Sequence, residues 1–195
     1  MKVYNVGLIG CGRIGTLLEK DTLRGKPCTH AGGFSALSNA KIVAGCDIDH
    51  SRLKRFSIDW GVNRLYKDYR EMLTLEKLDV VCIATWTNLH ASMVIDAARS
   101  GVKAIFCEKP IALNLDDAHQ MVRICKSKNI PLIINHERRW DSYYKKAHQI
   151  IKSGKIGEVR TIIGNTLSSR PGKKTTCNYG GGALFHDGTH LTDLL

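Results

Sequence analysis

The sequence predicts an α/β protein built on a doubly wound parallel sheet, and three observations support this fold class. A glycine-rich turn of the pattern Gly-x-Gly-x-x-Gly, residues 10–15, follows an apolar segment at residues 2–9. Short apolar segments then alternate with amphipathic ones as far as residue 134. One of them, residues 79–84, is almost continuously apolar, which is typical of a parallel strand buried on both faces. Together these features indicate a Rossmann fold.

The predicted strands and helices follow in a regular order. Strands are expected over residues 2–9, 41–46, 64–66, 79–84, 102–107 and 131–134. Helices are expected from near Arg13 and over residues 51–60, 69–75, 89–100 and 115–128. The connection over residues 20–36 is longer than a minimal fold of this type needs, and four residues punctuate it: Gly25, Pro27, Gly32 and Gly33. Six strands with their helices complete a first domain, residues 1–135.

The residues after 135 have a different character. A helix is expected over residues 141–153, where Gly154 and Gly157 end it, and a strand over residues 158–168 follows. A polar loop, the glycines at 180–182 and the start of a last helix complete the sequence. The last residues therefore read as a helix that is cut off soon after it begins.

Composition narrows the class of protein. The chain has 195 residues, 43% of them hydrophobic, and no apolar run approaches the ~20 residues of a membrane span. We therefore expect no membrane partner, and no secretory signal peptide is recognised at the N-terminus. The seven cysteines are odd in number and include no Cys-x-x-Cys pair, which favours reduced, mostly buried thiols in the cytoplasm over disulfides or a zinc site.

The net charge of +11 is unevenly distributed. Residues 1–120 carry 16 Lys and Arg against 13 Asp and Glu, whereas residues 121–195 carry 13 against 5. A basic segment of this kind can bind nucleic acid. Here the charges are scattered and no recognition motif accompanies them, so we expect a solvated face or a pocket for an anionic substrate, and no nucleic-acid partner.

The glycine turn predicts a dinucleotide site. Gly10 permits the tight turn, Gly12 leaves room for the backbone to approach a pyrophosphate, and Gly15 allows close packing of the next helix, with Arg13 and Ile14 between them. The N–H groups at the start of a helix suit phosphates. The alternative is a glycine-rich turn in another kind of α/β protein.

Further candidate contacts to the cofactor follow two other strands. Asp47 ends the strand at residues 41–46, where a carboxylate can accept hydrogen bonds from the adenosine ribose, favouring NAD over NADP. The long connection accounts for its large separation from the glycines. The alternative is that Asp47 only caps the next helix. Thr85, Asn88 and His90 follow the strand at residues 79–84, at the edge where ligands bind in such sheets.

Several of these motifs, in this order, resemble the glucose-fructose oxidoreductase / inositol dehydrogenase / MocA-like family. The resemblance extends over essentially the whole chain. Its residues are the glycine motif, Asp47, Ala84-Thr85 with His90, Glu108-Lys109-Pro110, Arg138-Arg139, residues 153–157, the glycines at 180–182 and His190. The long connection with Thr29-His30-Ala31-Gly32-Gly33 is similar to that of a subset of the family.

The resemblance implies an NAD(P)-dependent oxidation or reduction at a hydroxyl-bearing carbon of a sugar, cyclitol or sugar derivative. It places Glu108 and Lys109 near the cofactor, with Lys109 and His190 at the reacting carbon. Loss of hydride from a carbinol requires a base at its O–H group, and a partly desolvated lysine can serve. The alternative for Lys109 is an exposed lysine at the end of a strand. In relatives the Lys-Pro bond is often cis.

The chain departs from the family pattern near these residues. Trp86 stands where relatives usually have proline. His186 occupies the position, four residues before His190, where the family commonly has aspartate, and the carboxylate lies instead at Asp187. Either residue can face His190 on a helix, so Asp187 is a candidate catalytic residue, or else a helix cap. The spacing also permits a metal site, but we expect none.

The resemblance also defines what the second domain and the whole protein are expected to do. Relatives continue with an open antiparallel sheet that one strand and one full helix cannot form. The resemblance therefore implies that residues 136–195 are the truncated, incomplete start of an α+β substrate and dimerisation domain. A full-length homo-oligomer and a polyol or sugar substrate are expected. Two other functions stay open: an NAD-dependent glycosidase of the same family and a non-catalytic, cofactor-binding regulator.

Overall fold

The structure is a computed structural model, and it describes residues 2–165, 181–182 and 184–194. The chain divides into two compact units, Met1–Ile134 and Asn135–Leu195. The domain boundary predicted after residue 135 lies one residue from this division, while the function of each unit stays a prediction. Within the described residues, no helix is both long enough and apolar enough to cross a membrane.

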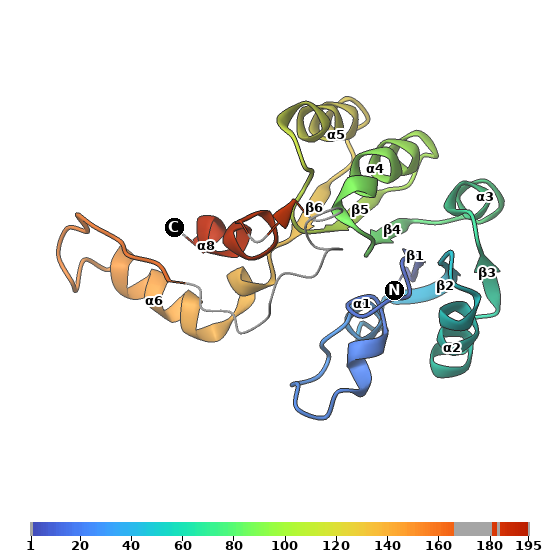
Figure 1. Cartoon of the computed structure of the whole chain (residues 1–195), viewed down its shortest axis with the longest axis horizontal. Helices are drawn as coiled ribbons and strands as arrows, with labels where there is room; N and C mark the ends of the chain where they lie inside the picture. Colours follow the sequence, from blue (N-terminus) through green and yellow to red (C-terminus); the bar gives the residue numbers. More distant parts are fainter. Residues whose placement is uncertain (1, 166–180, 183, 195) are drawn as a thin grey trace. The chain divides into compact units, whose positions relative to one another are not determined.

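The first unit is built on a six-stranded sheet with the strand order β3-β2-β1-β4-β5-β6 (Figure 1). The strands are β1 (Tyr4–Ile9), β2 (Ala40–Cys46), β3 (Arg64–Tyr66), β4 (Val80–Ile83), β5 (Ala104–Glu108) and β6 (Leu132–Asn135). β1 pairs in parallel with β2 and β4, β2 with β3, and β4 with β5. The chain winds outward from β1 in both directions, which confirms the predicted doubly wound sheet.

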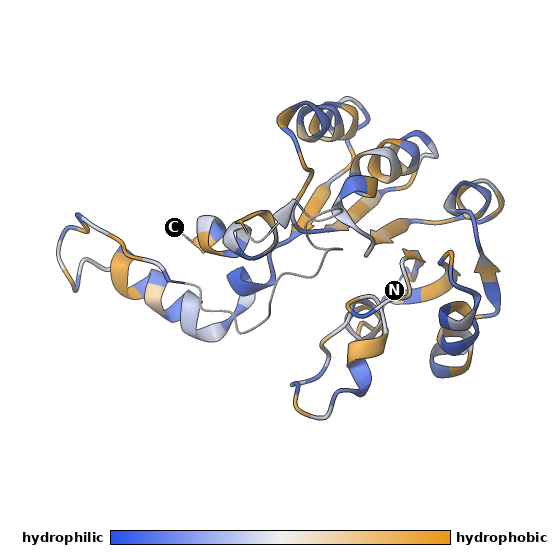
Figure 2. Cartoon of the chain, in the orientation of Figure 1, coloured by the Kyte–Doolittle hydropathy of each residue, from blue (hydrophilic) through white to orange (hydrophobic). Residues whose placement is uncertain are grey.

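Helices cover both faces of the sheet, and buried apolar side chains form a cluster on each face. The central strands are largely hydrophobic (Figure 2). The helices are α1 (His30–Ser35), α2 (His50–Trp60), α3 (Tyr69–Leu75), α4 (His90–Arg99) and α5 (Leu115–Ser127), with short 3-10 turns η1 (Leu17–Lys20) and η2 (Thr87–Leu89). Cys82 of β4 packs in the core on the side of α1 and α2, whereas its neighbours Val81 and Ile83 pack on the side of α3, α4 and α5. This alternation gives the sheet two separate cores.

The region after the glycine turn differs from the prediction. Instead of a helix from Arg13, the chain forms turns over residues 12–16, then η1, and only resumes as α1 after the connection over residues 21–29. The reason lies in the backbone hydrogen bonds. The carbonyl of Ile14 accepts from the N–H of His30 at 3.0 Å, and that of Gly15 from Ala31 at 2.9 Å. The start of α1 donates to the carbonyl groups of residues 14 and 15, which a continuous helix would bond to the residues four positions later. The first helix is therefore interrupted by the connection, and α1 continues it after residue 29.

The second unit contains η3 (Glu137–Trp140), α6 (Ser142–Lys152), a π-helical turn η4 (Leu184–Gly188) and α8 (Thr189–Leu194). α6 matches the predicted helix, and its N-cap Asp141 accepts from the N–H groups of Tyr143 and Tyr144. The predicted strand over residues 158–168 is not formed over residues 158–165, which are exposed and have no strand partner in the described part of the chain. Residues 166–168 and Gly180 lie outside the described residues.

Candidate functional site

The candidate residues of the first unit gather at the carboxyl ends of β1, β2, β4 and β5. In a doubly wound sheet this edge, beside the switch point between β1 and β4, is where ligands bind. Gly10 and Asp47 follow β1 and β2, while Thr85 and Lys109 follow β4 and β5. The four strand ends therefore present one continuous set of candidate groups.

Two of the three glycines are required by the fold itself. Gly10 has a φ of +97°, and a Cβ placed on it would lie 2.5 Å from the carbonyl oxygen of Ala84. A Cβ on Gly15 would lie 2.0 Å from the carbonyl oxygen of Gly10. Any side chain at either position would collide with backbone atoms. The turn and its contact with the end of β4 thus depend on glycine at both positions.

Gly12 has no such requirement. Its φ lies outside the left-handed region, and the nearest atom to a Cβ placed there is Nη1 of Arg52, at 3.6 Å. The protein would therefore accept a side chain at this position. The open space above Gly12 fits the close approach of a diphosphate, which is the role predicted for it. Arg13 is exposed and Ile14 half-buried beside it.

Asp47 is buried at the end of β2 and joined to the glycine turn. Its Oδ2 accepts from the N–H of Cys11 at 2.9 Å, and its Oδ1 accepts from the N–H of Asp49 at 2.9 Å. The cap of α2 is Asp49, whose carboxylate accepts from the N–H groups of Ser51 and Arg52. The structure therefore rules out the alternative in which Asp47 caps this helix. Its carboxylate is fixed beside the space above Gly12.

His90 connects the ends of β4 and β5. Its ring is buried, with Nδ1 2.9 Å from the carbonyl oxygen of Pro110 and Nε2 3.3 Å from that of Thr85. Burial lowers the pKa of His90, which favours the neutral ring, and the single N–H of that ring can donate to only one of the two carbonyl oxygens at a time. Thr85 is half-buried and Asn88, in η2, is exposed. The contacts of His90 hold two loops of the candidate site together, and its predicted contact with the cofactor stays a prediction.

Glu108 is a second buried acidic residue at this edge. It ends β5 and is buried, with Oε1 2.8 Å from Nε2 of His30, while Oε2 accepts from the backbone N–H of Lys109 at 3.2 Å. Lys109 is half-buried, and its bond to Pro110 is cis. His30 was not among the predicted site residues. The one sequence signal for His30 was its place in the unusually long connection. Its contact with Glu108 could not be predicted, because the two residues lie 78 positions apart in the sequence.

The surroundings of His30 favour its protonated form. Burial alone lowers the pKa of this histidine, but the Cys82 and Glu108 side chains that face it outweigh burial and raise its pKa to about 10. The ring of Phe106 packs edge-on against the ring of His30, with centroids 5.4 Å apart. The contact is charge-assisted when His30 is protonated, which is the form that these surroundings favour.

The second unit holds the remaining candidates. His190 is buried in α8, with Nδ1 3.6 Å from Oε2 of Glu137. In the same unit Asp193 accepts from Nε of Arg139 at 2.9 Å and lies 3.8 Å from Nδ1 of His136. Sequence reasoning did not single out His136, Glu137 or Asp193.

Asp187 lies half-buried in η4, in the turn before α8, and His186 lies in the same turn. The predicted partnership between Lys109 and His190 joins residues of different units and stays a prediction. Among the residues that the structure describes, no group of three or more His, Cys, Asp and Glu side chains could hold a metal ion.

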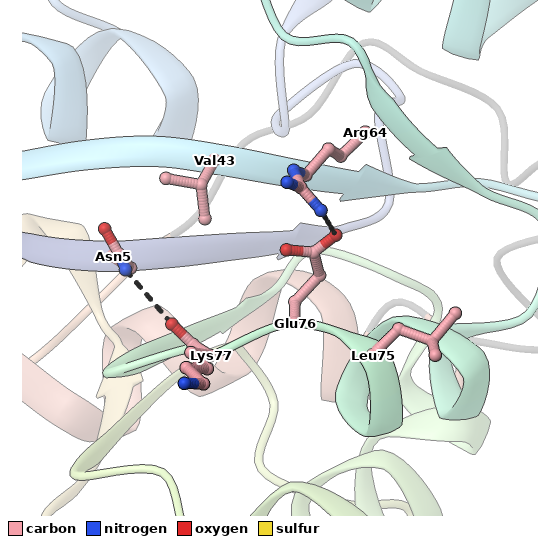
Figure 3. Close-up of a pocket in the computed structure, with 6 residues that line it drawn as sticks. All are labelled: Asn5, Val43, Arg64, Leu75, Glu76 and Lys77. Carbon is pink, nitrogen blue, oxygen red and sulfur yellow. Dashed lines mark hydrogen bonds and ion pairs between the residues drawn. The ribbon is translucent and has the colours of Figure 1, made fainter.

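A hollow of about 390 Å³ lies at the opposite, amino-terminal side of the sheet (Figure 3). Two polar contacts lie among its lining residues: Arg64 Nη1 lies 3.0 Å from Oε1 of Glu76, and the Asn5 side chain donates to the backbone carbonyl oxygen of Lys77. These pairings give the hollow a structural explanation, and none of the predicted site residues lines it.

Comparison with known proteins settles the family. The family model described as "Oxidoreductase family, NAD-binding Rossmann fold" matches residues 4–136. The chain belongs to this family. It is 36% identical over 157 residues to a D-apiose dehydrogenase of Paraburkholderia graminis, and this alignment covers 80% of this chain and 38% of that protein. It is 32% identical over 157 residues to a myo-inositol 2-dehydrogenase of Thermotoga maritima, and this alignment covers 80% of this chain and 43% of that protein.

A solved structure agrees with this assignment. The scyllo-inositol dehydrogenase of Lactobacillus casei with bound NAD(H) and scyllo-inositol superposes with a TM-score of 0.70 at 25% identity. The match covers 80% of this chain and 43% of that one. The chain thus spans about two fifths of the length of these oxidoreductases. The predicted family, the Rossmann fold and NAD as the family's cofactor are confirmed.

Proposed function

We propose that this chain is the cofactor-binding part of an NAD-dependent dehydrogenase acting on a hydroxyl-bearing carbon of a sugar, cyclitol or sugar derivative. The observation that carries the proposal is the linked set of strand ends. Asp47 binds the glycine turn, Gly10 lies against the end of β4, and His90 joins that end to the Lys109-Pro110 segment. Relatives named as apiose and inositol dehydrogenases support the substrate class.

Residues of this chain fit the diphosphate and the adenosine ribose of the cofactor. The open backbone at Gly12 would hold the diphosphate. Each carboxylate oxygen of Asp47 already accepts one N–H and keeps a further lone pair, so Asp47 can accept from the ribose hydroxyls. A ribose 2′-phosphate would instead place negative charge against this buried carboxylate. NAD, when bound, supplies the hydride acceptor, and we propose that NADP is disfavoured.

Lys109 is proposed as the group that takes the proton from the substrate hydroxyl. It follows β5 at the carboxyl edge of the sheet, and its backbone is held by Glu108. A half-buried amine close to a cationic nicotinamide would lose its proton more easily, which suits a base. His190 is proposed to share this proton, and Asp187 to support His190.

The second unit is proposed to begin the substrate and dimerisation domain. The excess of 13 basic over 5 acidic residues after residue 120 suits a substrate that carries negative charge. We further propose that the substrate is a small polyol or sugar derivative, that the protein is cytoplasmic and that it assembles into a homo-oligomer.

Cofactor titration and turnover test the proposal together. We expect saturable quenching of protein fluorescence by NADH in this chain. In the whole protein we expect NADH to accumulate steadily from NAD with at least one of myo-inositol, scyllo-inositol and D-apiose. A glycosidase would release product without steady NADH accumulation, because it recycles its cofactor. Absence of NADH binding, or binding without turnover of any polyol or sugar, would contradict the assignment.

A further inference from the structure

We propose that His30, carried by the connection inserted between β1 and β2, is a positioning residue that fixes the backbone of Lys109. The proposal deepens the proposed function and rests on it only for the role of Lys109 as a base. Its structural part concerns contacts within the first unit alone.

The contacts form a continuous path from His30 to Lys109. His30 Nε2 and Glu108 Oε1 are 2.8 Å apart, and the two side chains are only 5% and 9% exposed. The other oxygen of Glu108 accepts the backbone N–H of Lys109. One carboxylate therefore binds the inserted connection through one oxygen and the candidate base through the other.

His30 is itself held from several directions. Its backbone N–H binds the carbonyl of Ile14 in the glycine turn, and its ring packs on Phe106 of β5. Thr29, just before it, caps α1 and donates its hydroxyl to Glu19 at 2.6 Å. The ring position thus depends on both the glycine turn and β5, so the cofactor-binding turn is linked to the segment that carries Lys109.

A buried carboxyl oxygen that loses its donor is costly, so the donor that faces Oε1 helps to hold the Glu108 side chain in position. Nε2 of His30 is placed against this oxygen. Without the imidazole ring, Oε1 would lose this contact, the side chain would shift or take up a proton, and its bond to the Lys109 N–H would weaken. The expected consequence is a local loosening at Lys109 that is larger than any general loss of stability.

Amide hydrogen exchange resolved by residue tests this directly on the ¹⁵N-labelled chain. In His30→Ala we expect the Lys109 amide to exchange about tenfold faster relative to core amides of β4, the effect of losing one hydrogen bond. His30→Gln keeps an N–H donor, so it should restore exchange at Lys109 to within about threefold of the parent chain. His50→Ala, at an exposed histidine of α2, is the matched control and should leave Lys109 unchanged.

The outcomes separate this proposal from the proposed function. If Lys109 and the β4 amides accelerate equally in His30→Ala, or if Lys109 does not respond, the positioning role is wrong. Should His30→Ala fail to fold, His30→Phe, which fills the same space without a donor, replaces it: the proposal expects its Lys109 amide to exchange about tenfold faster relative to β4, and an unchanged amide contradicts the proposal. A Lys109 amide that exchanges as fast in His30→Gln as in the variant without a donor would contradict the donor path. NADH binding by the parent chain, measured separately, tests the proposed function alone.

Discussion

At the scale of single residues, the three glycines of the turn serve two different purposes. A Cβ added to Gly10 or Gly15 would lie 2.5 Å or 2.0 Å, respectively, from a backbone oxygen, so the folded chain excludes side chains at both positions. A Cβ on Gly12 would meet only the side-chain end of Arg52, at 3.6 Å. The motif is therefore partly a requirement of folding and partly a requirement of the ligand, and these parts can be separated by mutation.

Gly12→Ala is expected to leave the melting temperature nearly unchanged and to weaken NADH binding by about tenfold or more, which corresponds to ~1.4 kcal/mol. The added methyl group would occupy the space proposed for the diphosphate. Fluorescence titration with NADH and a melting curve on one preparation provide the measurement. Gly33→Ala, in α1 with open space around it, is the control and should bind NADH normally. Normal NADH affinity in Gly12→Ala would exclude a diphosphate at this position.

Asp47 leads to a prediction about the cofactor. Because its carboxylate is buried and fixed by two N–H groups, it cannot turn away from a 2′-phosphate. We expect NADPH to bind about tenfold more weakly than NADH. Arg52 lies 3.8 Å from Asp47 and can offset part of this difference. Competitive titration of the two reduced cofactors measures it, and equal or tighter binding of NADPH would remove Asp47 from this role.

Lys109→Met is expected to abolish turnover in the whole protein while NADH affinity stays within about threefold of the parent. Removal of a positioned proton acceptor typically lowers the rate by ~10²–10⁴. Methionine keeps most of the volume of the side chain, so packing should change little. Lys67→Met, at an exposed lysine after β3, controls for loss of charge. A variant that retains more than about a tenth of the parental rate would show that Lys109 is not the base.

At the scale of elements, most of the first unit could be predicted because its signals are local. The six strands lie within two residues of their predicted bounds at every end, and α3 spans the predicted residues 69–75. Buried parallel strands read as short apolar runs, and side-chain caps such as Asp49 and Asn114 mark where helices begin. Both signals are contained in a few neighbouring residues.

The features that could not be predicted depend on contacts between distant residues. The interruption of the first helix follows from hydrogen bonds between residues 14–15 and 30–31, across the connection. The ion pair between His30 and Glu108 joins two elements that no local pattern relates. The strand expected over residues 158–168 failed over its described part for a related reason. A strand is stable only where another strand is present to pair with it.

The link between α1 and β5 predicts how stability depends on pH. The groups that face His30 are Glu108, Cys82 and the Phe106 ring. Its pKa rises from the usual 6.5 to about 10, so its stabilising contribution is complete below about 6.5 and is lost as pH rises toward 10. The free energy of unfolding should fall in this range by at most about 1.4 kcal/mol per pH unit. Denaturant unfolding between these limits measures it.

His30→Gln provides the comparison, because glutamine cannot titrate in this range. The free energy of unfolding of the parent chain minus that of the variant should decrease steadily as pH rises. Buried thiols such as Cys46, whose pKa burial raises to about 12, affect parent and variant alike and cancel in the difference. A difference that is constant with pH would show that His30 is neutral in the folded chain.

At the scale of the whole molecule, the two units differ in how they are stabilised. The first has a sheet with two cores, and the largest fully buried side chains lie in it: Phe56, Leu8, Ile9, Met72, Ile83, Ile105 and Met121. In the second, α6 has no buried residue, and large apolar side chains are exposed, including Trp140, Tyr143, Ile163 and Leu184. The first unit has the core that an independently folding domain needs, whereas the described part of the second does not show one of its own.

Limited digestion with trypsin is therefore expected to cut first between residues 152 and 160, where Lys152, Lys155 and Arg160 are exposed outside any sheet. Cleavage by a protease requires an extended, accessible backbone, and residues 158–165 form neither helix nor strand.

The first unit should persist as a fragment that binds NADH with the affinity of the intact chain, because the glycine turn, Asp47 and Lys109 all lie within it. Mass spectrometry of the products locates the cuts, and NADH added during digestion should slow cleavage before residue 134 while leaving the first cuts unaffected. Early cleavage inside the sheet, or a fragment that no longer binds NADH, would show that the first unit depends on the second for its stability.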